Sequence, residues 1–190
     1  MKKTIKGGAM LAPVPPAIVT CGSVEKPNML TVAWTGMLAT VPPTTYISVR
    51  PERFSYHIIK ESGEFVINLC TEKLVPVADF SGVRSGRDTD KFAVCGVHAE
   101  PSPNLSLCPS LSESPVNIQC KVRDMVHLGS HDMFIADIVG ISVDESLWDK
   151  NGKIHLDKAG LAAYAHGEYF ALGKKLGSFG YTVKKKKKKR

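Results

Sequence analysis

The feature that most constrains the fold is a pair of long, strand-like segments with almost nothing between them. Residues 116–129 read VNIQCKVRDMVHLG, residues 132–143 read DMFIADIVGISV, and only Ser130 and His131 separate them. Segments so rich in β-branched and apolar residues, joined by so short a connection, predict two antiparallel strands in a tight hairpin. His131 is expected at the tip of that hairpin.

Shorter strand signals precede the hairpin. Residues 17–39 predict two neighbouring strands joined at the turn KPN, and residues 44–50 and 64–70 predict one strand each. With the long hairpin this gives at least six strands, and no internal repeat is visible. The sequence therefore predicts a mainly antiparallel β-barrel.

Helical signals are few and short. Residues 53–62 have the apolar spacing of a short helix, and Gly63 follows as a C-cap. Residues 72–83 predict a second helix, with Pro76 tolerated in its first turn. Residues 101–115 contain four prolines and are predicted to be a loop that contributes little to the core.

The charge distribution separates a neutral body from a basic tail. The 190 residues carry a net charge of +7, and Lys184–Arg190 alone supply seven positive charges, so residues 1–183 are neutral overall. A terminal run of like charges is expected to be solvated and disordered, with weak attraction to anionic polymers or membrane surfaces as the alternative. We expect one domain over residues 1–183, a tail over 184–190, and neither a specific nucleic-acid partner nor a membrane partner.

The cysteines and the first residues bear on the compartment. Five cysteines, an odd number with no CxxC pair, make a disulfide framework improbable. The N-terminus begins like a signal peptide, but glycines and prolines interrupt its apolar region, and no stretch reaches transmembrane length. The sequence predicts an untargeted, cytoplasmic protein.

Several classes of site lack their sequence signatures. The chain contains no GxGxxG after a strand, no GxxxxGK[ST] and no GxSxG, which disfavours Rossmann, P-loop and nucleophile-elbow chemistry. Cys95 and His98 have the spacing of one half of a zinc site, but no second pair lies at ligand distance. No metal is expected.

The stretch at residues 28–40, NMLTVAWTGMLAT, has neither the alternation of a half-buried strand nor the continuous apolar run of a core strand. Small hydroxyl residues and a glycine on such a strand are typical of a place where a ligand approaches the backbone. The side chains that could contact a planar ring there are Asn28, Thr31, Trp34 and Thr35. From spacing alone, a barrel strand whose threonines reflect β-propensity is the stronger alternative.

Two further segments have the composition of phosphate sites. RPERFS places Arg50, Arg53 and Ser55 at a strand-to-helix junction, where free amides and an arginine favour an anion. RSGRDTDKF could grip a phosphate through Arg87 or Lys91. The alternatives are an N-cap serine beside surface arginines and a loop whose charges pair with one another.

His131 is a candidate for hydrogen bonding to a ligand or for proton transfer. A histidine titrates near neutral pH and could donate a hydrogen bond to a ligand or act in proton transfer. A lone histidine at a hairpin tip is more often an ordinary surface residue, and the same holds for His166 in AHGEYF.

Five segments occur in a distinctive order along the chain: PPAIVTCGS, PNMLTVAWTGMLATVPP, RPERFSYHIIKESGEFVINL, SGRDTDKF and HGEYFALGKKLGSFG. Together they resemble the flavin reductase-like, FMN-binding split-barrel family, and most closely its flavoredoxin-type members. The resemblance covers roughly residues 10–183 and leaves the lysine tail outside. It implies an FMN-binding split-barrel domain, mainly β with a few short helices.

The resemblance also implies a homodimer with one FMN per subunit near the dimer interface. The implied cofactor contacts are Asn28, Thr31, Trp34, Thr35, Arg50, Ser55, Lys91 and His131. The first four would lie along the isoalloxazine ring and ribityl chain, and Arg50, Ser55 and Lys91 would serve the phosphate or ribityl end. His131, in a G-x-H turn, is the expected catalytic residue, positioning the ring or a hydride donor, and the partner subunit is one source of it.

The implied function is that of an FMN-dependent oxidoreductase, a flavin reductase or a flavoredoxin-like protein. Electrons would come from NAD(P)H or from a redox partner protein and pass through bound FMN to an acceptor. The alternative is a binding protein without turnover, which carries electrons or stores flavin. The fold itself does not decide between them.

Overall fold

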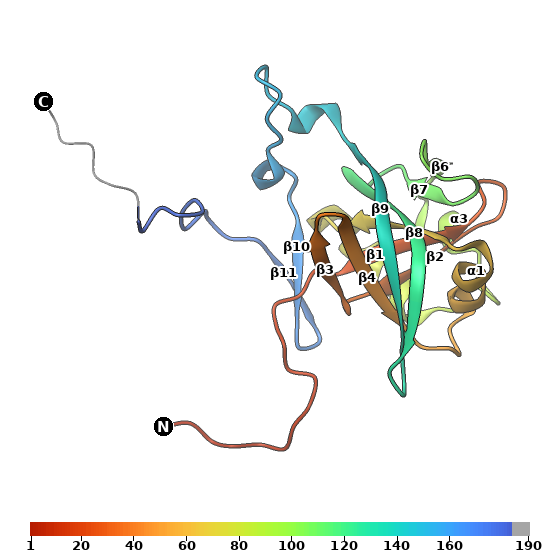
Figure 1. Cartoon of the computed structure of the whole chain (residues 1–190), viewed down its shortest axis with the longest axis horizontal. Helices are drawn as coiled ribbons and strands as arrows, with labels where there is room; N and C mark the ends of the chain where they lie inside the picture. Colours follow the sequence, from red (N-terminus) through yellow and green to blue (C-terminus); the bar gives the residue numbers. More distant parts are fainter. Residues whose placement is uncertain (184–190) are drawn as a thin grey trace, which may run out of the picture.

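The computed structural model describes residues 1–183, and the predicted basic tail lies outside the described residues. Seven strands form one antiparallel sheet in the spatial order β2-β1-β5-β8-β9-β4-β3 (Figure 1). Their bounds are Ala17–Gly22 (β1), Pro27–Val32 (β2), Thr35–Thr40 (β3), Pro43–Val49 (β4), Glu64–Leu69 (β5), Val116–His127 (β8) and Asp132–Val143 (β9). The prediction of a mainly antiparallel β structure is confirmed.

The sheet curls into a barrel because β2 and β3 are consecutive in the chain but lie at opposite ends of the strand order. Only Ala33 and Trp34 separate them, so the two edges of the sheet must approach each other. The amide of Ser48 in β4 donates to the carbonyl of Trp34 over 2.9 Å. Within residues 1–183 no ladder of paired residues joins β2 to β3 or β4. The barrel is therefore split along this line.

The same break corrects the prediction for residues 17–39, which form three strands instead of two. β2 pairs with β1, whereas β3 pairs with β4 on the other side of the barrel. The chain crosses from one edge to the other at Ala33 and Trp34, and neither is a glycine, a proline or another turn-forming residue. The change of partner is set by the closure of the barrel, so local sequence carried no signal for it.

The long hairpin is confirmed as β8 and β9, which pair along their length with two irregularities of register. β8 ends slightly earlier than predicted, whereas β9 has the predicted bounds, so the turn spans residues 128–131. Its amide at Leu128 donates to the carbonyl of His131 over 2.9 Å, and Gly129 has a φ of +79°. That left-handed conformation ends β8 before the glycine.

Both predicted helices are present. Helix α1 (Phe54–Ser62) ends at Gly63, whose φ is +67° and whose amide donates to Ile59. Helix α2 (Val75–Val83) follows the 3₁₀ turn η1 (Glu72–Leu74) and has Pro76 in its first turn. A third helix, α3 (Lys91–Cys95), was not predicted, and the carboxylate of Asp90 caps it by accepting from the amide of Ala93.

The expectation that residues 101–115 contribute little to the core is wrong. The segment contains most of a two-stranded sheet, β6 (Ala99–Pro101) with β7 (Pro109–Leu111), and Cys108 and Leu111 are fully buried. Buried side chains of the barrel hold it: Thr20 donates to the carbonyl of Pro109 over 2.5 Å, and the carboxylate of Glu64 accepts amides at residues 106–108. Pro101 and Pro109 lie at strand ends, where no ladder donor is needed.

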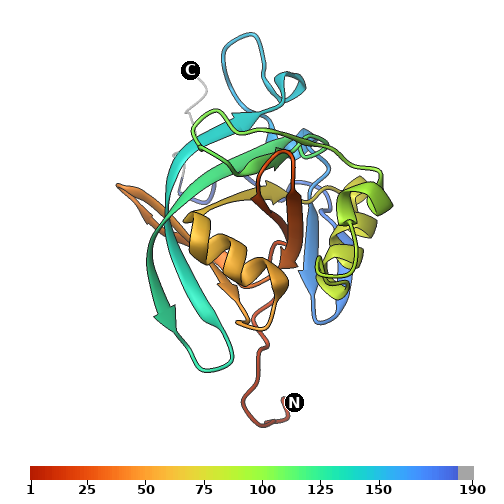
Figure 2. The ribbon, with the colours of Figure 1, turned by 90° about the vertical axis from the view of Figure 1, so that its right-hand side faces the viewer.

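Two hydrophobic cores explain the unusual pattern of the β2 stretch. Leu30 and Val32 point into the barrel interior beneath α1, whereas Met29 points to the second core beneath α2 and α3. Figure 2 shows α1 on one side of β1 and β2, and α2 and α3 on the other. Because both faces of β2 are covered, apolar residues follow one another without alternation.

A small hairpin and two terminal arms complete the structure. Strands β10 (Ala162–Ala165) and β11 (Glu168–Ala171) pair with each other, and Tyr164 exchanges two backbone hydrogen bonds with Val14. The remaining 3₁₀ turns are η2 (Glu145–Leu147) and η3 (Leu156–Lys158). Both arms leave the body on the side of β3, β10 and β11 (Figure 1). Among residues 1–183 no helix has the length and apolar character to cross a membrane.

Candidate functional site

Two adjoining cavities lie along β2, where the barrel is split. The larger has a volume of about 630 Å³ and the smaller about 420 Å³. β2, the β4–α1 junction and the end of α2 form their common boundary. The residues that line both are Leu30, Thr31, Arg50, Arg53, Gly82 and Val83. The two cavities thus form a continuous site for an elongated ligand with two different ends.

The smaller cavity is strongly cationic. The basic residues that line it are Arg50, Arg53, Arg84, Arg87 and Lys91. The acidic residue in its lining is Glu52, which lies 3.4 Å from Arg50. A hydrogen bond orients Arg53, because its Nη1 donates to the carbonyl of Gly82 over 3.1 Å. An excess of fixed positive charge in a concave site favours an anion, and arginine forks match the oxygens of a phosphate.

Ser81 adds an unsatisfied hydroxyl to this cavity. Its Oγ is buried and has no hydrogen-bond partner among the described residues. Buried hydroxyls in folded proteins are nearly always paired. Since Ser81 lines the smaller cavity, a polar ligand atom there would supply the missing hydrogen bond. No sequence signal marks this residue, which lies within a predicted helix.

Lys91 is buried and lines the smaller cavity. Its Nζ donates to the carbonyls of Met29 and Ser81 over 2.7 and 3.0 Å. Desolvation is the main cause that lowers the pKa of Lys91 to about 8, and the positive charge of Arg53 lowers it further. An ammonium has three protons, so one remains for a ligand.

Asn28 and Ser55 form a hydrogen-bonded pair beside Lys91. The amide nitrogen of Asn28 donates to Ser55 Oγ over 2.7 Å. Ser55 lines the smaller cavity, whereas Asn28 lies behind it and lines neither cavity. A Cβ at Gly86 would overlap the side-chain oxygen of Asn28, so the loop of residues 84–90 packs directly on this pair. Asn28 therefore orients Ser55 and supports the loop.

The two threonines of the predicted ligand strand have different positions. Thr31 lines both cavities, and its hydroxyl donates to the carbonyl of Ala78 in α2 over 2.5 Å. The hydroxyl of Thr35 donates to the carbonyl of Tyr46 over 2.6 Å. Thr35 lines neither cavity. The structure thus places Thr31 at the site and Thr35 in the β3–β4 ladder beyond it.

Trp34 and His131 both lie in the lining of the larger cavity, although they come from opposite parts of the sheet. Trp34 follows β2 and is 37% exposed. His131 reaches the cavity from the tip of the β8–β9 hairpin, and Ser130 Oγ lies 2.9 Å from its Nδ1. Trp34 thus has two roles. Its carbonyl accepts the hydrogen bond from Ser48 that joins the two edges of the sheet, and the residue lines the larger cavity.

A buried carboxylate fixes the base of that hairpin. Asp132 accepts from the hydroxyl of Tyr56 in α1 over 2.5 Å, and its other oxygen lies 2.8 Å from His127 Nδ1. These hydrogen bonds, that of Tyr56 first, hold the pKa of Asp132 below its usual range. The hairpin tip that carries His131 is therefore anchored to the helix that begins at the cationic cavity.

The structure also assigns lining residues that sequence reasoning did not select. Asp79, Tyr164 and Tyr169 line the larger cavity, and Arg84 lines the smaller one. The two tyrosines lie on strands β10 and β11, which carried no recognised strand signal. Among residues 1–183 no three histidine, cysteine, aspartate or glutamate side chains gather closely enough to hold a metal ion.

The profile of the flavin reductase like domain matches residues 10–173. The chain belongs to the flavin reductase-like family. Flavoredoxin of Desulfovibrio vulgaris (Miyazaki F) has the same fold, with a TM-score of 0.89 and 29% identity over 97% of this chain and 100% of that chain. The predicted family and the predicted split-barrel fold are confirmed.

Two further relatives bear on the site. An NADPH-flavin oxidoreductase of Streptomyces viridifaciens is 23% identical over 139 residues, which are 72% of this chain and 70% of that protein. An FMN-binding protein of Thermus thermophilus, with 1-cyclohex-2-enone bound, superposes with a TM-score of 0.78 and 22% identity over 94% of this chain and 99% of that chain. The second likeness concerns the fold alone. Flavin-related oxidoreductase function follows for this chain from its family.

Proposed function

We propose that this chain binds FMN across the two cavities and uses it as an electron-transfer oxidoreductase. The observation that carries the proposal is the change of chemistry along β2. A cationic cavity with an unsatisfied hydroxyl adjoins a larger cavity lined by aromatic side chains. FMN has the same polarity, with a phosphate at one end and a planar ring system at the other.

The smaller cavity fits the phosphate and the ribityl hydroxyls. Arg53 and Lys91 are both held by backbone carbonyls and would contact the anion with little reorganisation. Arg50 is available from the β4–α1 junction, and Ser55 and Ser81 supply hydroxyls. The third proton of the Lys91 ammonium would complete its hydrogen bonding through the ligand.

The larger cavity fits the ring. β2 is the last strand of the sheet order, so one of its backbone edges has no strand partner among the described residues. That edge, from Leu30 to Ala33, lines the cavity and can pair with the polar edge of a planar heterocycle. Thr31 lies at its centre, and Trp34 at its end offers an aromatic surface.

Bound FMN would supply hydride and single-electron chemistry that no side chain provides. The residues around it would bind, orient and stabilise. Backbone amides of the β2 edge and the imidazole of His131 are donors fixed near the ring, where they stabilise negative charge without reorganisation. Asp132 would act through the hairpin to keep His131 at the cavity. Asn28 would position Ser55 at the phosphate end.

NAD(P)H or a redox protein is the proposed electron source. The name of the Streptomyces relative, NADPH-flavin oxidoreductase, supports a nicotinamide donor. The likeness to a flavoredoxin supports a protein partner as the second candidate. Five free thiols support a reducing, cytoplasmic location.

The test has two stages. Titration of the purified chain with FMN, followed by the flavin absorbance and fluorescence, should show saturable binding at one site per subunit. The loaded protein is then mixed with NADH or NADPH. Steady oxidation of the nucleotide supports the reductase, and binding without turnover supports the carrier or storage function. A chain that binds no FMN contradicts the proposal.

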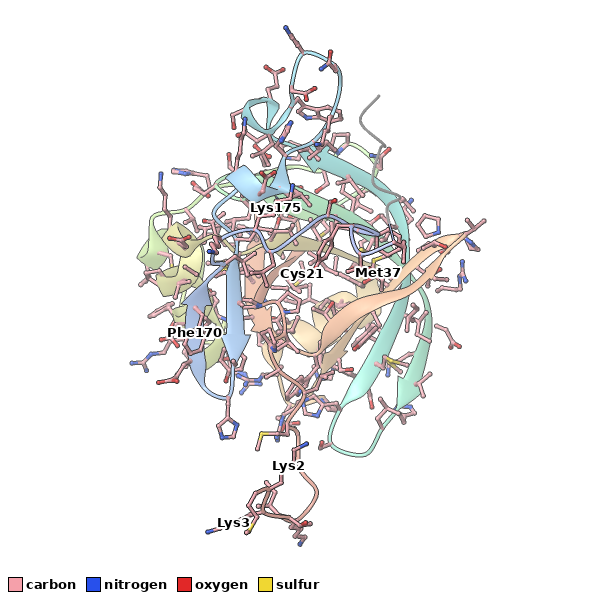
Figure 3. The ribbon with its side chains drawn as sticks, turned by 90° about the vertical axis from the view of Figure 1, so that its left-hand side faces the viewer. Lys2, Lys3, Cys21, Met37, Phe170 and Lys175 are labelled. Carbon is pink, nitrogen blue, oxygen red and sulfur yellow. The ribbon has the colours of Figure 1, made fainter. Side chains whose placement is uncertain are left out.

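A homodimer is the proposed assembly. The C-terminal arm carries apolar side chains away from the body, among them Leu176 and Phe179, which are 87% and 106% exposed. Figure 3 shows this side of the molecule, with Met37 of β3 and Phe170 of β11 on either side of the view and Lys175 in the arm. Exposed apolar arms beside an exposed apolar face fit a second copy of the chain.

Sedimentation velocity tests the homodimer. Phe179→Asp should shift the protein toward the monomer, because the arm loses its apolar contact with the partner. Val94→Asp is the matched control, since Val94 is exposed on α3, on the opposite side of the body. A wild-type chain that sediments as a monomer would contradict the assembly.

A further inference from the structure

Four residues of the N-terminal arm line the larger cavity although they belong to no helix or strand. Residues 9–12, AMLA, lie in its lining together with β2 and the β10–β11 hairpin. All four are exposed, and the apolar side chains of Met10 and Leu11 have exposed fractions of 55% and 82%. The proposed FMN contacts do not include them. Exposed apolar groups at a ligand cavity are available to cover a ligand.

One end of this segment is fixed to the cavity lining. The amide of Val14 donates to the carbonyl of Tyr164 over 2.9 Å, and the amide of Tyr164 donates to the carbonyl of Val14 over 2.8 Å. Both residues line the larger cavity. Pro13 and Pro15 flank Val14, and each proline ring restricts its own backbone. Residues 9–12 therefore extend from a rigid point at the cavity.

The other end of the segment is not attached to the body. Among the described residues, none forms a hydrogen bond or an ion pair with residues 1–12. A Cβ built on Gly7 or Gly8 would meet no atom within 4 Å beyond its chain neighbours, so nothing packs against this pair. Glycines adopt many backbone conformations, and segments with few contacts open at little cost in free energy. Residues 9–12 can therefore move about Val14.

We propose that residues 9–12 form a strap that closes over the ring of a flavin in the larger cavity, and that Met10 and Leu11 retain the flavin there. The inference rests on the proposed function, because the ring is what the strap covers. Four extended residues span at most about 14 Å, enough to cross a three-ring heterocycle. The strap has no charged or polar side chain, so it contacts the ring and not the phosphate. Because a closed strap must open before the flavin leaves, it slows release and makes the flavin a retained group.

The rate of flavin release tests the strap in the full chain. The double variant Met10→Ser, Leu11→Ser removes the apolar contact, and both side chains are exposed, so the fold is unaffected. The matched control is Lys2→Ser, Lys3→Ser, in the same arm but outside the cavity lining. Each chain is loaded with FMN or riboflavin, and release on stopped-flow dilution is followed by flavin fluorescence. Release from the strap variant should be at least about fivefold faster, by the same factor for both flavins, and unchanged in the control.

Limited proteolysis of the wild-type chain measures closure itself, without turnover. Chymotryptic cleavage at Met10 and Leu11 should slow at least about fivefold when FMN is added, whereas tryptic cleavage after Lys3 should keep its rate. Equal release rates from the wild type and the strap variant, or cleavage at Met10 and Leu11 that FMN does not slow, overturn the strap and leave the proposed function standing. A wild-type chain that binds no FMN overturns both.

Discussion

The two cavities share one strand and the arginines Arg50 and Arg53, yet the remainder of their linings differs in chemistry. The smaller is surrounded by the start of α1, the end of α2 and the loop of residues 84–90, which contribute arginines and serines. The larger is surrounded by the β10–β11 hairpin and the N-terminal arm, which contribute tyrosines, histidine and apolar surface. A single sheet edge can thus serve both ends of an amphipathic ligand. We expect the cationic cavity to provide affinity and the aromatic cavity to provide orientation and selectivity.

The largest expected effect comes from Lys91→Met. Loss of a buried, charge-assisted hydrogen bond to the phosphate should weaken FMN binding by about 30- to 100-fold, or about 2–3 kcal/mol, and leave riboflavin binding nearly unchanged. Isothermal titration of both ligands measures this. Lys73→Met, an exposed lysine in η1, is the control. Equal losses of affinity for FMN and riboflavin would show that Lys91 does not contact the phosphate.

The next largest effect is the pH dependence of FMN affinity that the titration of Lys91 causes. With a pKa of about 8 in the free protein, its positive charge is lost above that pH, so FMN affinity should fall by about tenfold between pH 7 and pH 9. The stability of the ligand-free protein has the opposite sign. The unfolded chain holds the proton up to its ordinary pKa of 10.5, so this group adds stability as pH rises from about 8 to 10.5. Thermal melts and FMN titrations across this range check both signs, and parallel trends would contradict them.

Trp34→Ala probes the aromatic cavity. Loss of a stacking surface should weaken FMN and riboflavin by the same factor, about fivefold or about 1 kcal/mol, because both share the ring. Trp148→Ala is the matched control, since Trp148 is also exposed and lines neither cavity. A loss confined to FMN would place Trp34 at the phosphate end.

Ser81→Ala has the smallest expected effect on binding and the most distinctive pattern. FMN affinity should fall about threefold, while the ligand-free protein becomes more stable by up to about 1 kcal/mol, because an unsatisfied buried hydroxyl is removed. Ser114→Ala is the comparison, since the buried Ser114 hydroxyl has carbonyl partners at Leu69 and Val116. That variant should lose stability and keep its affinity. Destabilisation by Ser81→Ala would indicate a partner within the protein.

Much of the fold could be predicted because its signals are local. The long hairpin, the α1 helix with Gly63 and the Pro76 helix each depend on residues within one segment. The crossing between β2 and β3 and the burial of β7 could not be predicted in this way. They depend on barrel closure and on the distant side chains of Thr20 and Glu64.

The site residues likewise fall into those that local sequence predicts and those that it does not. Arg50 and Ser55 were candidates at a strand-to-helix junction and Lys91 in a charged loop, the family resemblance made them cofactor contacts, and the structure brings all three to one cavity. Hydroxyl residues in a strand carry less information, because Thr31 and Thr35 look alike in sequence and only Thr31 lines the site. Ser81 and Tyr169 line the cavities because of tertiary packing, which produces no sequence motif.

The measurement that tests the central claim most directly compares FMN with riboflavin on the purified wild-type chain. The two ligands share the ring and the ribityl chain and differ only in the phosphate. If the cationic cavity provides the affinity, FMN should bind at least about 30-fold more tightly than riboflavin, or about 2 kcal/mol, at pH 7 and low salt. Equal dissociation constants would contradict the account, because the arginines, Ser81 and Lys91 would then not serve the phosphate.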